Sequence, residues 1–427
     1  MLPLITDVCM VQPLFKVTTI EESLKIFRQS FDFATFFKNR DEQIDLINAY
    51  GRVLAENVIS AENIPGFNRS TMDGYAVKAS DTYGASDSLP AYLDLLGEIK
   101  MSEKPSYVLQ KGQAARISTG GMLPEGADSV VMLEYTEDLS PTMIEISRSV
   151  APWENVLRDD EDIKKNERVL EKGRYLRPQD IGLLAALGLE RIKVFKILVV
   201  AIISTGNEII SINQKPEPGQ VRDINSFTLG AAVKQVGCIP YYAGIIKDNE
   251  KMLKNVLQKY LDTPEIDLVL ISGGSSVGIR DYTLEVLDNL GSPGILVHGL
   301  ALKPGKPTII SLNKQKLFVG LPGHPVSAMM VFDNVVKKII FDLKGEILHI
   351  GQRKTIDALL ESNVFSDAGR EEYVRVVLKS KNDQLWAEPI LGKSGIISSL
   401  AKADGYITIK LNQEGLYQGE KVSVTIF

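Results

Sequence analysis

Residues 266–307, with the sequence IDLVLISGGSSVGIRDYTLEVLDNLGSPGILVHGLALKPGKP, decide the fold class of this 427-residue chain. The run 267–271 is short, apolar and rich in branched side chains, which indicates a strand buried on both faces. A glycine-serine loop over 272–278 follows it, and a helix with leucines at helical spacing is predicted from Asp281 onward. This order is typical of an open α/β sheet that binds an anion at the carboxyl edge of its strands.

Two successive strand ends in this stretch carry groups suited to an oxyanion. The loop 272–278 offers backbone N–H groups beside its glycines and the hydroxyls of its serines. The turn 303–307 places the ammonium groups of Lys303 and Lys306 three positions apart on a stiff Pro-Gly backbone. Together with the carboxylate of Asp281, these groups favour a phosphorylated or oxyanionic substrate and a metal ion.

Neither of two familiar phosphate motifs is present. Residues 299–306 are not a P-loop, because five residues separate the glycines and Pro307 follows the lysine. No strand-linked GxGxxG occurs, which excludes the dinucleotide-binding fingerprint. The alternative interpretation is that both loops are ordinary β–α connections.

The composition is that of a soluble globular protein, with 44 % hydrophobic and 24 % charged residues. The length predicts about three domains, and the net charge of −6 argues against a general nucleic-acid binder. Cys9 and Cys238 form no CxxC pair, and the three histidines lack metal-ligand spacing. No basic signal peptide and no bilayer-length apolar run occur, so we expect a cytoplasmic protein.

The remaining patterns predict local structure along the chain. Helices are expected at 19–27, behind a Thr19–Glu22 capping box, and at 43–58, 177–188, 226–236, 248–261, 282–290 and 326–341. Short runs broken by Gly and Pro make 75–150 β-rich, and short strands predict a small β domain over 350–427. Between 191 and 343, strands and helices alternate from a first strand at 194–203, which predicts a three-layer α/β/α domain with a mostly parallel sheet.

Three carboxylates follow three strands of this predicted sheet: Glu208, Asp248 and Asp281. Because the carboxyl ends of parallel strands share one edge, we expect these acids to converge there. Carboxylates beside two lysines indicate a divalent metal on oxygen ligands, with Mg²⁺ the best match. Separate helix-cap acids are the alternative.

The motifs, in their order, resemble the molybdopterin molybdenumtransferase family, which comprises bacterial MoeA, the E domain of gephyrin and the plant Cnx E domain. The matching segments span nearly the whole chain and read STMDGYAV (70–77), RISTGG (116–121), RPQDIGLLAALG (177–188), STGNE (204–208), GIIKD (244–248), SGGSSVGIRDYT (272–283), LKPGKP (302–307), GLPGHPVSA (320–328) and GREEYVRV (369–376).

The resemblance implies an enzyme of molybdenum cofactor biosynthesis. The substrates would be adenylylated molybdopterin and molybdate, and the adenylate would be hydrolysed with Mg²⁺, releasing AMP and molybdenum cofactor. It also implies a homodimer with each active site near the interface, contacts with a pterin adenylyltransferase and with cofactor-accepting molybdoenzymes, and no nucleic-acid or membrane partner. Four domains would follow: a helical linker and dimerisation domain (14–62 with 151–190), a β-rich inserted domain (63–150), a molybdopterin-binding α/β domain (191–345) and a C-terminal β domain (346–427).

Site residues carry over motif by motif. The catalytic residues implied are Asp73, Thr119, Glu208, Asp248 and Asp281, of which Glu208, Asp248 and Asp281 would bind Mg²⁺. Substrate would contact Ser272, Gly273, Gly274, Ser275, Gly278, Lys303, Lys306, Pro322 and Ser327. Molybdate would meet Arg370, Arg375, Ser398 and Ser399, while Asp162 matches the acid of the family's GEDI segment.

Several positions depart from the family pattern. His324 stands where the family commonly has Asn, and residues 222–225 (RDIN) replace a YDSN-like segment. A single-domain pterin adenylyltransferase is one alternative, but it needs only 191–343. A non-catalytic scaffold or carrier is another, and the retained acids and lysines argue against it. Insertion of tungstate in place of molybdate stays open, because the two oxyanions are nearly the same in size and charge.

Overall fold

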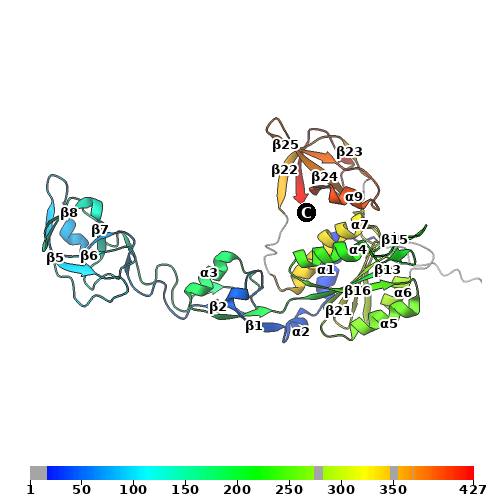
Figure 1. Ribbon diagram of the computed structural model, residues 1–427, viewed down its shortest axis with the longest axis horizontal. Helices are drawn as coiled ribbons and strands as arrows, with labels where there is room; N and C mark the ends of the chain where they lie inside the picture. The colour runs from blue at the N-terminus through cyan, green and yellow to red at the C-terminus, as the bar shows by residue number, and fades with distance from the viewer. Residues whose placement is uncertain (1–16, 274–281, 347–353, 368) are drawn as a thin grey trace, which may run out of the picture.

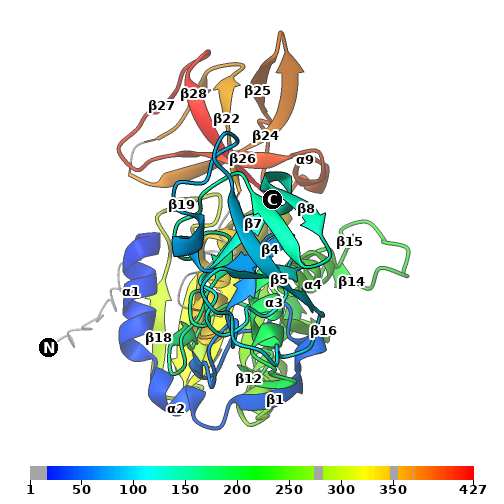
Figure 2. The same cartoon turned by 90° about the vertical axis from the view of Figure 1, so that its left-hand side faces the viewer.

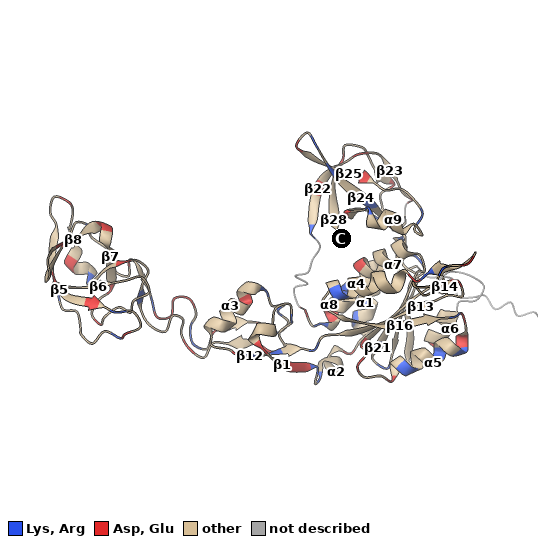
Figure 3. Ribbon diagram, viewed as in Figure 1, with Lys and Arg blue, Asp and Glu red and all other residues tan. Residues whose placement is uncertain are grey.

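The computed structural model describes residues 17–273, 282–346, 354–367 and 369–427 of an elongated molecule (Figure 1). A three-layer domain and a C-terminal β domain lie at one end, and a β-rich inserted domain lies at the other, beyond a narrow linker. Lys and Arg are interleaved with Asp and Glu over all of these parts (Figure 3). Among the helices of the described residues, none is both long and apolar enough to cross a membrane.

The three-layer domain is built on a six-stranded sheet, and its order is β16-β13-β17-β21-β20-β18. The strands are β13 (Val199–Thr205), β16 (Ile239–Ile246), β17 (Leu268–Ser272), β18 (Pro293–His298), β20 (Ile309–Asn313) and β21 (Lys316–Leu321). The first four strands in the order run parallel, β20 runs antiparallel to them, and β18, which pairs antiparallel with β20, runs in the same direction as the first four. The predicted mostly parallel sheet is therefore confirmed.

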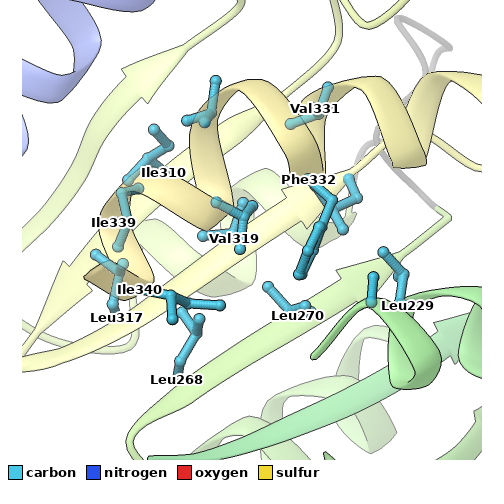
Figure 4. Close-up of a cluster of buried hydrophobic side chains, with 14 of the residues drawn as sticks. Leu229, Leu268, Leu270, Ile310, Leu317, Val319, Val331, Phe332, Ile339 and Ile340 are labelled. Carbon is cyan, nitrogen blue, oxygen red and sulfur yellow. The ribbon is translucent and has the colours of Figure 1, made fainter. Parts of the chain in front are cut away.

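Helices cover both faces of this sheet. One face packs against α1 (Ile20–Ser30), α4 (Asn225–Gln235), α7 (Pro325–Val331) and α8 (Lys337–Leu343), and the other against α5 (Glu250–Leu261) and α6 (Tyr282–Asp288). Alternate residues of β17 face opposite layers, so that Leu270 belongs to the first core and Ile271 to the second. Figure 4 shows the Phe332 side chain lying over Leu270. Each such buried side chain stabilises the fold by about 1.5–3 kcal/mol.

The predicted helices of this domain are confirmed, and the structure differs from the prediction in two details, an interruption between α7 and α8 and an additional short helix. Thr19 caps α1 as expected, because its hydroxyl accepts a hydrogen bond of 3.1 Å from the backbone N–H of Glu22. The helix predicted over 326–341 is interrupted between α7 and α8 by a π-helical segment, Phe332–Val336. The short helix α2 (Phe33–Phe37) adds aromatic side chains that pack on Phe31 beside this core.

The prediction of a helix over 43–58 is wrong. Residues Asp41–Asp45 form strand β1, which pairs antiparallel with β12 (Arg191–Phe195), and only a 3₁₀ turn, Leu46–Asn48, follows. The apolar spacing that suggested a helix instead places Ile44 and Leu54 in one linker core. The backbone N–H of Leu54 donates to the Arg174 carbonyl (3.0 Å), a partner distant in sequence that periodicity does not reveal.

The single strand predicted at 194–203 is also wrong, because it is two strands in two sheets. β12 ends at Phe195 in the linker, and β13 begins at Val199 in the three-layer domain. The linker contains the confirmed helix α3 (Pro178–Ala186), and two further strands, β2 (Val58–Ile59) and β11 (Arg168–Leu170), pair beside it. The linker is therefore made of two segments of the chain, one that leads to the inserted domain and one that returns from it.

The inserted domain has a six-stranded sheet of order β7-β4-β6-β5-β9-β8. Its strands are β4 (Gly74–Val77), β5 (Ala91–Ile99), β6 (Gln113–Ile117), β7 (Ser129–Met132), β8 (Thr136–Ser140) and β9 (Met143–Ile146), and β3 (Arg69–Ser70) pairs with β10 (Val156–Leu157) at its base. Short 3₁₀ turns lie at Ala79–Thr82 and Leu133–Tyr135. The predicted β-rich character of 75–150 is confirmed.

The C-terminal domain is a second small β structure above the three-layer domain (Figure 2). Its elements are β22 (Thr355–Leu360), β23 (Val364–Phe365), β24 (Glu371–Lys381), β25 (Gln384–Pro389), α9 (Ile397–Ala401), β26 (Gly405–Ile409), β27 (Gly415–Leu416) and β28 (Lys421–Ile426). A short strand from the three-layer domain, β19 (Leu302–Lys303), pairs with β24 in parallel. The lysine turn is thus hydrogen-bonded into the sheet of the neighbouring domain.

Candidate active site

A pocket of about 640 Å³ lies between the three-layer domain and the C-terminal domain, at the carboxyl ends of β13, β17 and β21. Residues predicted from sequence that line it are Glu208, Gly273, Lys303, Lys306, Pro322, Ser327 and Arg370. Residues not predicted to contact substrate also line it, among them Thr205, Arg222, Asp223, Asn225, His324 and Ser394. Both predicted loops, the one after β17 and the lysine turn, therefore reach one cavity.

The floor of the pocket needs glycine at position 273. Gly273 has φ +105°, and a Cβ there would lie 2.1 Å from the carbonyl oxygen of Thr205. Its N–H donates to the Leu321 carbonyl (3.2 Å), which joins the ends of β17 and β21. Gly274, Ser275 and Gly278, predicted from the same loop, lie outside the described residues.

A buried side-chain amide holds three strand-end loops together. Nδ2 of Asn225 donates to Oγ of Ser272 (2.6 Å) and to the carbonyl oxygen of Gly323 (2.8 Å). Just before it, the carboxylate of Asp223 accepts hydrogen bonds from the hydroxyl of Ser204 (2.8 Å) and the N–H of Ser226 (3.1 Å). The RDIN segment therefore positions the predicted residue Ser272. In the sequence, the only indication that Asp223 and Asn225 position Ser272 was that both are polar and directly precede the helix predicted at 226–236.

The lysine turn is held at the mouth of the pocket by both domains. Nζ of Lys303 lies 3.1 Å from a carboxylate oxygen of Glu372 and 3.7 Å from one of Asp367, both in the C-terminal domain. Gly305 between the lysines has φ +138°, and a Cβ there would lie 2.1 Å from a methyl carbon of Leu302. Close packing thus fixes the turn that presents Lys303 and Lys306.

The four residues predicted to meet molybdate are separated by the structure. Arg370 lines the pocket and makes a 3.1 Å ion pair with Asp367. Arg375 is only 6 % exposed and donates to Oγ of Ser399 (2.5 Å) within the C-terminal domain, and burial lowers the pKa of its guanidinium. Ser398 is exposed on α9. Within the described chain, Arg370 is the member of this set that faces the cavity.

The predicted metal ligands Glu208 and Asp248 follow two neighbouring strands. Glu208 lines the pocket. The carboxylate of Asp248 accepts a hydrogen bond from the N–H of Asn207 (3.2 Å), and the N–H of Asp248 donates to Oδ1 of Asn207 (3.1 Å). Lys247 donates to the Asn207 carbonyl (3.0 Å), so the two loops are joined. Asp281 lies outside the described residues, among which no group of three potential ligands from His, Cys, Asp and Glu gathers.

The remaining predicted pair lies in the inserted domain, at the far end of the molecule (Figure 1). Oδ1 of Asp73 accepts hydrogen bonds from the N–H of Thr119 (2.7 Å) and from its hydroxyl (3.0 Å). These two bonds, the backbone one first, lower the pKa of the exposed Asp73 carboxyl below its usual range. Asp162 lies at the base of this domain, where its N–H donates to the Ile64 carbonyl (3.1 Å). One chain therefore does not bring Asp73 to the pocket.

Three protein-family models match successive parts of the chain. A family model described as the MoeA N-terminal region (domain I and II) matches residues 18–188. A probable molybdopterin binding domain matches residues 201–342, and the MoeA C-terminal region (domain IV) matches residues 357–427.

Individual relatives resemble the chain over most of their length. A putative molybdopterin biosynthesis protein of Methanocaldococcus jannaschii is 36 % identical over 90 % of this chain and 91 % of its own length. A molybdopterin molybdenumtransferase of Haemophilus influenzae is 32 % identical over 92 % of this chain and 95 % of its own. The crystal structure of the molybdopterin biosynthesis MoeA protein from Pyrococcus horikoshii superposes with a TM-score of 0.77 at 36 % identity, covering 96 % of this chain and 99 % of that one.

Proposed function

We propose a specific reaction for this chain, which belongs to the molybdopterin molybdenumtransferase family and is a transferase of molybdenum cofactor biosynthesis. The reaction is the insertion of molybdate into adenylylated molybdopterin. Water is taken up as the phosphoanhydride bond of the adenylate breaks and AMP leaves. Bonds form between molybdenum and the two dithiolene sulfurs as oxygen of molybdate leaves as water, and molybdenum cofactor is released. The buried free thiol of Cys238 is in keeping with a reducing, cytoplasmic compartment for this chemistry.

The observation that carries the proposal is the charge and shape of the pocket. Lys303, Lys306 and Arg370 line one wall, and the backbone at Gly273 lines another. Cations and close-approaching backbone are the groups that bind phosphate and similar tetrahedral oxyanions. A volume of about 640 Å³ is also in the range of cavities that enclose small-molecule ligands.

The described acids fit the magnesium ion of the proposed reaction. Carboxylate oxygens are the ligands that Mg²⁺ prefers, and Glu208 and Asp248 lie on adjoining loops at the same sheet edge. Together with Asp281, they would hold the ion, which supplies charge neutralisation at the phosphoanhydride. The protein's own part is to bind the oxyanions through Lys303 and Lys306.

The separation of Asp73 from the pocket supports a dimeric enzyme. The Asp73 carboxylate, whose pKa the hydrogen bonds from Thr119 lower, lies in the inserted domain and does not line the 640 Å³ pocket of its own chain. In a symmetric dimer of elongated subunits, the inserted domain of one chain can reach the three-layer domain of the other. We therefore propose that each active site combines the pocket of one subunit with Asp73 of its partner.

The test is turnover of the purified chain with adenylylated molybdopterin, Mg²⁺ and molybdate, measured as AMP release. We expect molybdate-dependent AMP release that Lys306→Ala lowers by about a hundredfold or more, because a preorganised charge is lost from the site. Lys393→Ala, on an exposed loop beside the pocket, is the matched control and should stay near wild type. Tight binding of the substrate without AMP release would instead indicate a carrier, and tungstate in place of molybdate would establish metal selectivity.

A further inference from the structure

We propose that His324 is an oxyanion-binding and specificity-determining residue of the pocket, oriented by Ser394 of the C-terminal domain. Its ligand is a tetrahedral oxyanion, either molybdate or the phosphate group of the nucleotide. The inference rests on the proposed function and deepens it, because it adds an imidazole, which can be neutral or cationic, to a site whose other basic side chains are lysines and arginines.

The start of helix α7 is tied to the C-terminal domain by two hydrogen bonds to one residue. Nδ1 of His324 lies 2.9 Å from Oγ of Ser394, and the N–H of Val326 donates to the Ser394 carbonyl oxygen (3.2 Å). His324 occupies the N-cap position of α7, but its side chain makes no cap within its own helix. Ser394 thus satisfies an early N–H of α7 from outside, and it holds the imidazole at the domain junction.

This contact fixes which ring nitrogen is left for a ligand. Nδ1 is engaged by Ser394, whose hydroxyl can donate to it or accept from it. The Cδ2–Nε2 edge of the ring lies next to Gly395, where an added Cβ would be 3.8 Å from Cδ2 and 3.9 Å from Nε2, which are ordinary contact distances. Both His324 and Gly395 line the pocket. An oxyanion there can accept a hydrogen bond from Nε2–H in the neutral or the protonated ring.

The charged groups around His324 favour an anion beside it. From the three-layer domain, the pocket receives Arg222, Lys303, Lys306, Glu208 and Asp223, and from the C-terminal domain it receives Arg370. The carboxylate of Asp223 is already bonded to Ser204 and Ser226. The lining cations outnumber the lining acids, but Glu372 and Asp367, which do not line the pocket, pair with Lys303 and Arg370. Protonation of His324 adds one further positive charge. Oxyanion affinity is therefore expected to be higher when the His324 ring is protonated than when it is neutral.

The experiment is calorimetric titration of the full chain with molybdate at pH 6.0 and pH 8.0. We expect binding about fivefold tighter at pH 6.0, because a protonated imidazole contributes one partly solvated charge interaction. His324→Asn keeps a neutral donor, so it should bind as wild type does at pH 8.0 but lose the gain at pH 6.0. Ser394→Ala should weaken binding at both pH values, because Nε2 is no longer held toward the pocket. His298→Gln, which removes a histidine from β18 at the far edge of the sheet, should behave as wild type.

The same titrations with AMP distinguish the two sources of the oxyanion. The phosphate of AMP itself changes protonation near pH 6, so the comparison is between wild type and His324→Asn at each pH. A pH-dependent gain that is equal in the two proteins, for molybdate and for AMP, overturns the proposal. Absence of molybdate and AMP binding at either pH overturns it as well. The proposed function fails separately: the wild-type protein would then release no AMP from adenylylated molybdopterin, although it still binds molybdate in the pH-dependent way expected here.

Discussion

The pocket of the three-layer domain and the Asp73–Thr119 pair of the inserted domain are built in opposite ways. The pocket draws side chains from two domains, and buried hydrogen bonds of Asn225 and Asp223 fix its floor. The Asp73–Thr119 pair lies on an exposed surface, where two hydrogen bonds from Thr119 hold the Asp73 carboxylate. The first region is complete enough to bind a ligand within one chain, whereas the second presents a single ionised carboxylate.

Under the proposed function, this difference assigns substrate binding to the pocket and part of the chemistry to Asp73. A pocket needs walls on several sides, which a junction of two domains supplies. A carboxylate that acts on a ligand bound elsewhere needs only to be held ionised and accessible, which a short turn at a sheet end achieves. The comparison predicts that the two regions operate together only across a subunit boundary.

The largest expected effect comes from mixing two inactive variants. Asp73→Asn and Lys306→Ala should each lower AMP release by about a hundredfold or more. After dissociation and reassociation of the mixed proteins, about one quarter of the wild-type activity should return, because half of the dimers are mixed and each has one intact site. Asp94→Asn, an exposed acid on β5 of the same domain, should remain active. If no activity returns on mixing, or if Asp73→Asn is fully active, the two regions do not form one active site across the subunit boundary.

A smaller effect is expected from the buried amide beneath the pocket. Asn225→Ala removes the donor shared by Ser272 and Gly323 and should lower the free energy of unfolding by about 2 kcal/mol. Calorimetry, with hydrogen exchange of strand β17 to identify the domain affected, measures the change. Asn249→Ala, which removes the exposed N-cap of α5, is the control at about 1 kcal/mol. Equal losses in the two variants would show that the Asn225 network is no more than a cap.

The smallest effect concerns the charge of Asp73. Hydrogen bonds from Thr119 lower the pKa of this carboxyl, so on acidification it stays ionised below its usual range. The stabilisation from these bonds is present above the unfolded-state pKa and is lost as pH falls through the lower, folded-state pKa. Thr119→Val keeps the backbone N–H but removes the hydroxyl, so the Asp73 pKa should rise part of the way to its ordinary value. Carbon NMR of labelled aspartate, assigned with Asp73→Asn, follows the titration, and an unchanged curve would contradict the role of the hydroxyl.

Local sequence was sufficient wherever a structural element is decided by its own residues. The apolar run that forms β17, the Thr19 cap of α1 and the proline-to-glycine helix α3 all depend on neighbours a few positions away. Sequence reasoning failed between 43 and 58 because β1 exists only through its partner β12, which lies about 150 residues later in the chain. The strand and the irregular chain that follows it bury Leu54 and partly bury Ile44, whereas Ile47, at the same helical spacing, is 89 % exposed.

The chain's sequence by itself determined the α/β class, the glycine-serine loop, the lysine turn and the family, because each rests on residue types at fixed spacing. Only the tertiary structure decided which candidates meet. It placed Lys303, Arg370 and Gly273 around one cavity, buried Arg375 against Ser399, and set Asp73 apart. It also joined His324 to Ser394, 70 positions away. Such contacts depend on how domains pack, and packing is decided by the buried surfaces of many residues rather than by a local motif.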